Sequence, residues 1–124
     1  MSPYKMSKIE ESIRITLKFF DCLNKKDIKT IGEVISSDCK YDDIWENKAS
    51  QNNKKEIQEY LVNLFNSYPN ISFIVTDANN LIHKCIAKYN IFGMYDDESV
   101  FINCIGLFEV KNHLITSVSL YAKK

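Results

Sequence analysis

The strongest constraint on the fold is a change of hydrophobic period at Pro69. Before this residue, apolar side chains recur three or four residues apart, as on one face of a helix, first at Ile9, Ile13, Leu17 and Phe20. From Ile71 onward the chain is rich in Ile, Val, Phe and Tyr, in runs typical of strands. A proline also stops a helix, so the sequence predicts helices first and a sheet second.

Three helices are expected before Pro69, each opened by a residue whose side chain can cap the first turn. We expect them over residues 7–24, 27–36 and 53–68, with caps at Ser7, Asp27 and Asn53. Glu10 and Glu56 stand three residues after the first and last of these caps, which completes a capping-box pattern in both places.

One short strand is expected among the helices, over 38–45, and four more after Pro69, over 71–82, 85–95, 100–110 and 114–121. The first turn of this meander stays open between His83-Lys84 and Asn79-Asn80, which is the stronger turn signal by composition and can instead mark a bulge. This order predicts one α+β domain over 1–124. Its sheet is expected to be antiparallel, strongly curved and cone-shaped, with the three N-terminal helices packed on its concave face.

The charge balance limits the partners that the chain can attract. Its 16 basic side chains equal its 16 acidic ones, so no net field favours binding to nucleic acid or to an anionic membrane surface. No apolar run approaches the roughly 20 residues that span a bilayer, and the start, MSPYKMSKIEES, lacks the apolar core of a signal peptide. We expect a cytoplasmic protein.

The four cysteines, Cys22, Cys39, Cys85 and Cys104, are spread singly through apolar stretches. Structural zinc sites usually have closely spaced Cys or His pairs, and His83 with Cys85 supplies only two ligands. We therefore expect reduced cysteines in the core, no metal and no cofactor.

The segment DCKYDDIWENKAS, residues 38–50, places two carboxylates beside a tyrosine and the one tryptophan of the chain. Successive side chains of a strand point to opposite faces, so Lys40 and Asp42 should lie outside. The inward set is then Cys39, Tyr41, Asp43 and Trp45. A carboxylate among aromatic rings loses hydration, which raises its pKa and makes Asp43 a candidate general base.

The same alternation predicts a pocket for a small apolar or aromatic molecule, lined by Phe19, Tyr41, Trp45, Tyr89 and Phe108. Small residues at Ala87, Gly93, Cys104 and Gly106 would leave room in it. A structural interpretation stays open: the aromatic side chains can simply form the core, and Asp43 can cap a turn or pair with a lysine.

The convex face of the sheet is also expected to be apolar, with Ile86, Phe92, Ile105 and Leu107 among its residues. So many large apolar side chains are rarely left wet on a monomer. A homodimer through this face is therefore expected.

Several phrases resemble the nuclear transport factor 2-like superfamily, in particular its SnoaL-like and ketosteroid-isomerase-like members. They are FFDCLNKKDIKTIGEVISSDCKYDD (19–43), NKKEIQEYL (53–61) and GLFEVKNHLITSVSLY (106–121). The resemblance spans nearly the whole chain and implies the cone fold and a homodimer. It also implies that Asp43 stands where isomerase-like members have their general base.

Two other positions depart from the isomerase pattern. The resemblance puts Phe19 where such members have a tyrosine, and Gly106 where they have a protonated aspartate, both of which donate to the developing oxyanion. One missing donor can cost about 3 kcal/mol of barrier lowering, so steroid isomerisation itself is not expected.

The expected function is a small-molecule-binding domain of SnoaL-like type with an apolar pocket for an unspecified ligand. Two alternatives stay open. One is a metal-free isomerase-like or cyclase-like enzyme with Asp43 as general base. The other is a structural or protein-interaction dimer module.

Overall fold

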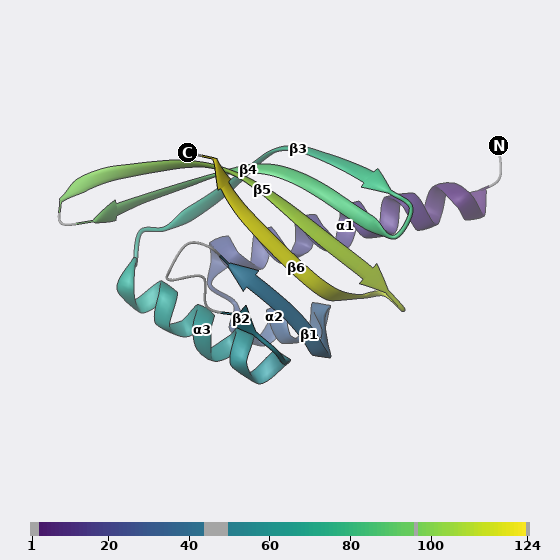
Figure 1. Cartoon of the computed structure of the whole chain (residues 1–124), viewed down its shortest axis with the longest axis horizontal. Helices are drawn as coiled ribbons and strands as arrows, with labels where there is room; N and C mark the ends of the chain where they lie inside the picture. Colours follow the sequence, from purple (N-terminus) through teal and green to yellow (C-terminus); the bar gives the residue numbers. More distant parts are fainter. Residues whose placement is uncertain (1–2, 44–49, 96, 124) are drawn as a thin grey trace.

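The computed structural model describes the backbone over residues 3–43, 50–95 and 97–123, and side chains over 11–42, 50–94 and 97–122. The helices are α1 (Pro3–Lys25), α2 (Ile28–Val34) and α3 (Lys54–Ser67). The strands are β1 (Ile35–Asp43), β2 (Ser50–Gln51), β3 (Ser72–Leu81), β4 (Lys84–Tyr95), β5 (Glu98–Lys111) and β6 (Leu114–Lys123). Helices first and a meander afterwards is the predicted order (Figure 1).

Two of the three predicted helix caps are confirmed. Asp27 Oδ1 accepts from the backbone N–H of Thr30 at 3.1 Å, and Asn53 Oδ1 accepts from the N–H of Glu56 at 2.9 Å. Each bond satisfies an amide that the first turn leaves unpaired. The expected start at Ser7 is wrong, because α1 begins at Pro3, a residue suited to the first turn of a helix.

Several strand boundaries differ from the prediction. β1 begins at Ile35, directly after α2, so the second helix is shorter and the strand longer than expected. The turn between β3 and β4 consists of residues 82–83, next to the predicted His83-Lys84 position, and Ile82 takes a positive φ of 56° there. Asn79 and Asn80 lie inside β3, paired with Ile86 and Cys85, so they form no turn.

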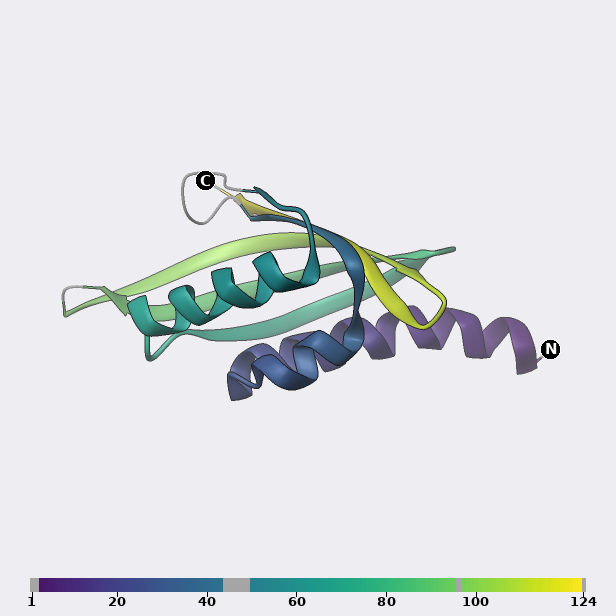
Figure 2. The same cartoon turned by 90° about the horizontal axis from the view of Figure 1, so that it is seen from below.

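The six strands form one sheet in the order β2-β1-β6-β5-β4-β3. The pairs from β3 to β6 are antiparallel, as predicted, but β1 runs parallel to β6. The expectation of a purely antiparallel sheet was wrong in this respect, because the chain crosses from β1 through α3 and the meander before it returns beside β1. The sheet is mixed and curled without closing on itself (Figures 1 and 2).

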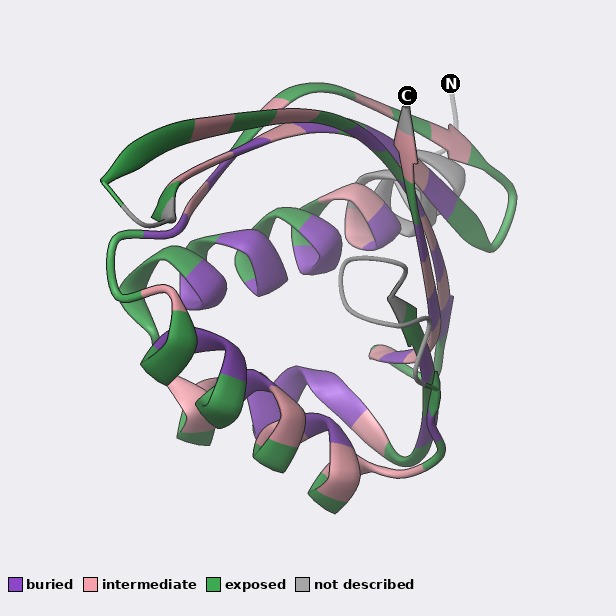
Figure 3. Cartoon of the chain, turned by 60° about the vertical axis from the view of Figure 1, so that its left-hand side comes forward, coloured by how far each residue is buried: buried purple, intermediate pink, exposed green. Residues whose placement is uncertain are grey.

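All three helices lie on the concave side of the curled sheet (Figure 2). Their buried faces turn inward, toward the sheet (Figure 3), where α1 packs against β3, β4 and β5, and α3 packs against β1 and β2. The core therefore lies inside the cone. None of the helical segments described here is both long and apolar enough to cross a membrane.

Candidate ligand-binding site

The predicted alternation on β1 is confirmed over the residues whose side chains are described. Cys39 and Tyr41 are buried on the concave side, whereas Lys40 and Asp42 are exposed. Asp42 Oδ1 accepts a 2.5 Å hydrogen bond from Ser50 Oγ on β2, which ties the two edge strands together. The backbone of Asp43 ends β1 in register with Leu120, but its side chain and the whole of Trp45 lie outside the described residues.

The alternation on β4 and β5 also follows the prediction. The buried inward residues are Cys85, Ala87, Tyr89 and Ile91 on β4 and Cys104, Gly106 and Phe108 on β5. Gly93 and Ile102, which the same alternation places inward, are half-buried. The outward set between them is exposed or half-buried. Both strands therefore present one apolar face to the helices, as a sheet packed on one side requires.

The structure brings four of the predicted wall residues into one aromatic cluster. The ring centroid of Phe19 lies 5.8 Å from that of Phe108 and 6.4 Å from that of Tyr41. Tyr89 joins through Phe20, whose centroid is 4.8 Å from Tyr89 and 5.4 Å from Phe108. Phe20 was not among the predicted site residues, although its place in the helical repeat already marked it as inward-facing. These separations are typical of favourable aromatic pairs.

The inner part of this cluster is closely packed. Phe19 and Phe108 have 0% exposure, and Tyr41 and Tyr89 only 2%. The room expected at Gly106 is taken by its neighbours: a Cβ there would lie 2.7 Å from Cε1 of Phe108 and 2.9 Å from Cδ2 of Leu120. Gly106 thus allows the Phe108 ring to pack against the sheet. Phe19 and Phe108 form the fully buried part of the cluster.

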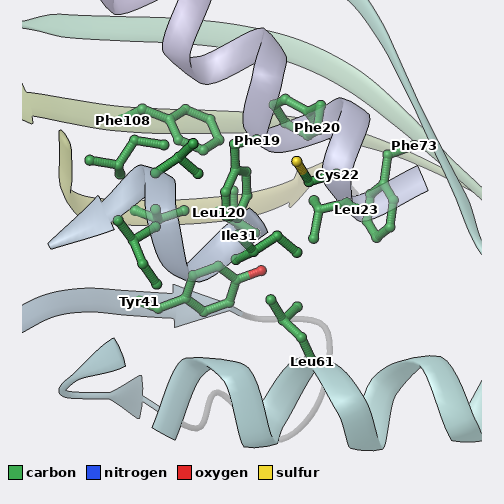
Figure 4. Packing of buried hydrophobic residues seen from close by; sticks show 14 of the residues in the cluster. Phe19, Phe20, Cys22, Leu23, Ile31, Tyr41, Leu61, Phe73, Phe108 and Leu120 are labelled. Atoms are coloured by element: carbon green, nitrogen blue, oxygen red, sulfur yellow. The ribbon is translucent and has the colours of Figure 1, made fainter. Parts of the chain in front are cut away.

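Toward α3 the cluster becomes more polar. The ring of Tyr41 lies between the side chains of α1 and Leu61 of α3 (Figure 4), and its centroid is 5.7 Å from that of the half-buried Tyr60. Gln51 on β2 stands directly opposite Tyr41 and is also buried. Gln51 was not predicted as a site residue, because β2 lies in a segment that reads as a polar loop. Tyr60, on α3, was not predicted as one either.

Three enclosed polar atoms of the described residues lack a hydrogen-bond partner: Thr16 Oγ1, Ser36 Oγ and Gln51 Oε1. Thr16 lies on α1 beside Cys85, whose thiol is near enough for a weak interaction.

Burial also governs the thiols. It raises the pKa of Cys39 to about 12, with a smaller contribution from Asp38, and raises the pKa of Cys85. All four cysteines are buried, and no disulfide joins any two of them. Protonated, enclosed thiols are poor nucleophiles. Across the described part of the chain, no group of three or more His, Cys, Asp or Glu side chains is placed to hold a metal ion.

No protein-family model and no curated protein matches this sequence. Solved structures do match in shape. A protein from Jannaschia assigned as a SnoaL-like polyketide cyclase matches with a TM-score of 0.82 at 12% identity, over 99% of this chain and 90% of that one. A protein of ketosteroid-isomerase-like fold from Catenulispora acidiphila, in complex with trimethylamine, has a TM-score of 0.79 at 15% identity, over 86% of this chain and 83% of that one.

An LEH-like epoxide hydrolase from M. tuberculosis is also similar, with a TM-score of 0.78 at 16% identity, over 93% of this chain and 84% of that one. These likenesses define the class of fold: an α+β cone in which helices fill a curled sheet. The chain shares its fold with proteins described as SnoaL-like polyketide cyclase and as ketosteroid-isomerase-like, the fold that the resemblance of its sequence phrases predicted.

Proposed function

We propose that this protein is a small-molecule-binding domain of SnoaL-like type, and that it takes a flat, largely apolar ligand on its concave face. The observation that carries the proposal is the convergence of aromatic side chains from α1, β1, α3 and β4 on one concave surface. Aromatic walls with a few polar ends are the usual lining of sites for such ligands.

The proposed place of binding is the end of the cluster next to α3. Phe19 and Phe108 have no exposed surface, so they support the site from beneath, and Tyr89 stands behind Phe20. Tyr41 and Tyr60 come from facing elements and the latter is only half-buried, which favours entry between β1 and α3.

Crystallography of protein purified directly from cells tests this proposal. Density for a co-purified molecule in contact with Tyr41 and Tyr60 would support it, and mass spectrometry of the released compound would give its mass. Protein that binds no apolar compound in a broad calorimetric or thermal-shift screen would count for the structural alternative, in which the same side chains serve only as core.

A second candidate function is a metal-free isomerase-like or cyclase-like enzyme with Asp43 as general base. It is favoured by the confirmed alternation of β1, because Asp43 follows two residues after the inward-facing Tyr41. Once a ligand is known, Asp43→Asn should abolish its turnover and preserve its binding. Equal turnover by the variant would leave binding alone as the function.

We also propose that the protein acts as a homodimer through its convex face. Phe101 and Tyr121 are 54% and 55% exposed, and the rings of Phe92 and Phe101 pair at 4.9 Å on the same surface. Ile105 stands beside Tyr121 in register, so the apolar surface continues across β4, β5 and β6. Apolar continuity of this kind marks surfaces that a partner covers. We also infer the cytoplasmic location that the sequence predicted, since the four cysteines form no disulfide with one another.

A further inference from the structure

Gln51 combines burial with an unused hydrogen-bonding group. Its side chain is 9% exposed, and Oε1 is fully enclosed without a partner among the described residues. An amide carbonyl in this position has lost its hydrogen bonds to water and gained none, at a cost of about 1–3 kcal/mol. Most buried polar atoms in proteins are satisfied, so this one requires a physical reason.

The position of Gln51 suggests that reason. It lies in β2 directly opposite Tyr41 of β1, and opposed residues of an antiparallel pair point to the same face of a sheet. Its amide therefore belongs to the concave side, next to the Tyr41 ring that Tyr60 approaches from α3. The unsatisfied acceptor therefore lies beside the end of the aromatic cluster that borders α3.

The other two enclosed atoms without a partner are hydroxyls, Thr16 Oγ1 and Ser36 Oγ. A hydroxyl can rotate and can either donate or accept, whereas an amide oxygen can only accept. The requirement of Gln51 is therefore more specific, because its Oε1 can be satisfied only by a hydrogen-bond donor. Of the three, it is also the one in register with a proposed ligand-contacting residue.

We propose that Gln51 is a specificity-determining residue, and that its Oε1 accepts a hydrogen bond from a hydroxyl or N–H group of the ligand. This inference rests on the proposed function and narrows it. The expected ligands are then flat aromatic or polycyclic molecules that carry a hydrogen-bond donor, such as phenols. Pure hydrocarbons and ethers, which have no such donor, should bind poorly. A site built around a polar partner discriminates strongly against analogues that lack it.

The test compares two probes, 2-naphthol and 2-methoxynaphthalene, by isothermal titration calorimetry. They share a ring system and an oxygen atom, but only the naphthol can donate. The wild-type protein should bind 2-naphthol about tenfold more tightly, as one net hydrogen bond implies. In Gln51→Met, which keeps the length of the side chain, the two Kd values should agree within about twofold.

Gln58→Met is the matched control. The Nε2 of Gln58 donates to the carbonyl of Ile28 at 3.1 Å, so this glutamine has a structural partner. The control should keep the tenfold preference and melt at a lower temperature. Gln51→Met should melt about 3 °C or more above the wild type without ligand, because it removes an unsatisfied buried group.

The outcomes separate the two proposals. Equal binding of both probes by the wild type, or a preference that survives in Gln51→Met, would overturn the role of Gln51 and leave the ligand site standing. Binding of neither probe, together with a lower melting temperature for Gln51→Met, would overturn both, because Gln51 would then be structural. A Gln51→Met protein that melts at a higher temperature than the wild type and no longer prefers 2-naphthol over 2-methoxynaphthalene would establish the inference.

Discussion

Asn24 near the end of α1 bonds twice to the backbone of Phe73 in β3. Its Nδ2 donates to the Phe73 carbonyl at 2.7 Å, and its Oδ1 accepts from the Phe73 N–H at 2.7 Å. β3 is an edge strand of the sheet, so these groups face no further strand. The amide thus takes the place of a neighbouring strand and fixes α1, with Phe19 and Phe20, over the concave face.

Replacing Asn24 with Ala should therefore lower the free energy of unfolding by about 1–3 kcal/mol, because both backbone groups of Phe73 lose their partner. Urea unfolding followed by circular dichroism measures this directly. Asn66→Ala, at an exposed position of α3, is the control and should be neutral or slightly stabilising. Equal effects of the two changes would contradict the bridging role of Asn24.

Gly106→Ala should destabilise the protein by about 1–3 kcal/mol, because the new methyl group would overlap the Phe108 ring. A shorter side chain at position 108 relieves that overlap. Phe108→Leu combined with Gly106→Ala should therefore lose less stability than the sum of the two single changes. Strict additivity in thermal or urea unfolding would show that the ring and the glycine do not share this space.

The alkaline limit of stability should reflect Cys39. Its folded pKa of about 12 lies above the value of 9.0 for a free thiol, because burial disfavours the thiolate. The folded protein keeps this proton after the unfolded chain has released it, so the contribution is complete below pH 9 and is lost as the pH rises toward 12.

Cys39→Ala removes this dependence. Relative to its own value at pH 8, the wild type should lose about 2 kcal/mol more stability than the variant near pH 10.5. Chemical denaturation at both pH values measures the difference, and ionisations common to the two proteins cancel. Parallel losses in the two proteins would mean that the Cys39 thiol ionises as easily folded as unfolded.

Leu107→Asp should convert the proposed dimer to a monomer, because a charge on the convex face would have to be desolvated in the interface. Sedimentation velocity measures the change in mass. Val62→Asp, at an exposed apolar position of α3, is the matched control and should remain dimeric. A Leu107→Asp protein that sediments as a dimer would place the interface elsewhere.

Residue patterns predicted the parts of the fold that depend on local rules. Alternation placed Tyr41, Tyr89 and Phe108 on the buried face, and the helix caps at Asp27 and Asn53 form as expected. These features depend on neighbours within one strand or one helical turn, so a single sequence contains them.

Features that depend on contacts between residues far apart in the sequence could not be predicted from these local patterns. β2 has two residues, too few for a period, and the parallel pairing of β1 with β6 joins segments far apart in the chain. Gln51 became a candidate only through the register with Tyr41. The packing of the Phe108 ring over Gly106 was likewise invisible, because a small residue in a sequence does not show which neighbour fills its space.

The central claim is that a small apolar molecule binds on the concave face next to α3. Its most direct test is an NMR titration of the labelled protein with 2-naphthol, followed through backbone amide shifts. We expect saturable shifts concentrated at Tyr41, Gln51 and Tyr60, with the convex residues Phe101 and Tyr121 unchanged. Shifts confined to the convex face, or no saturable shift at any residue, would contradict it.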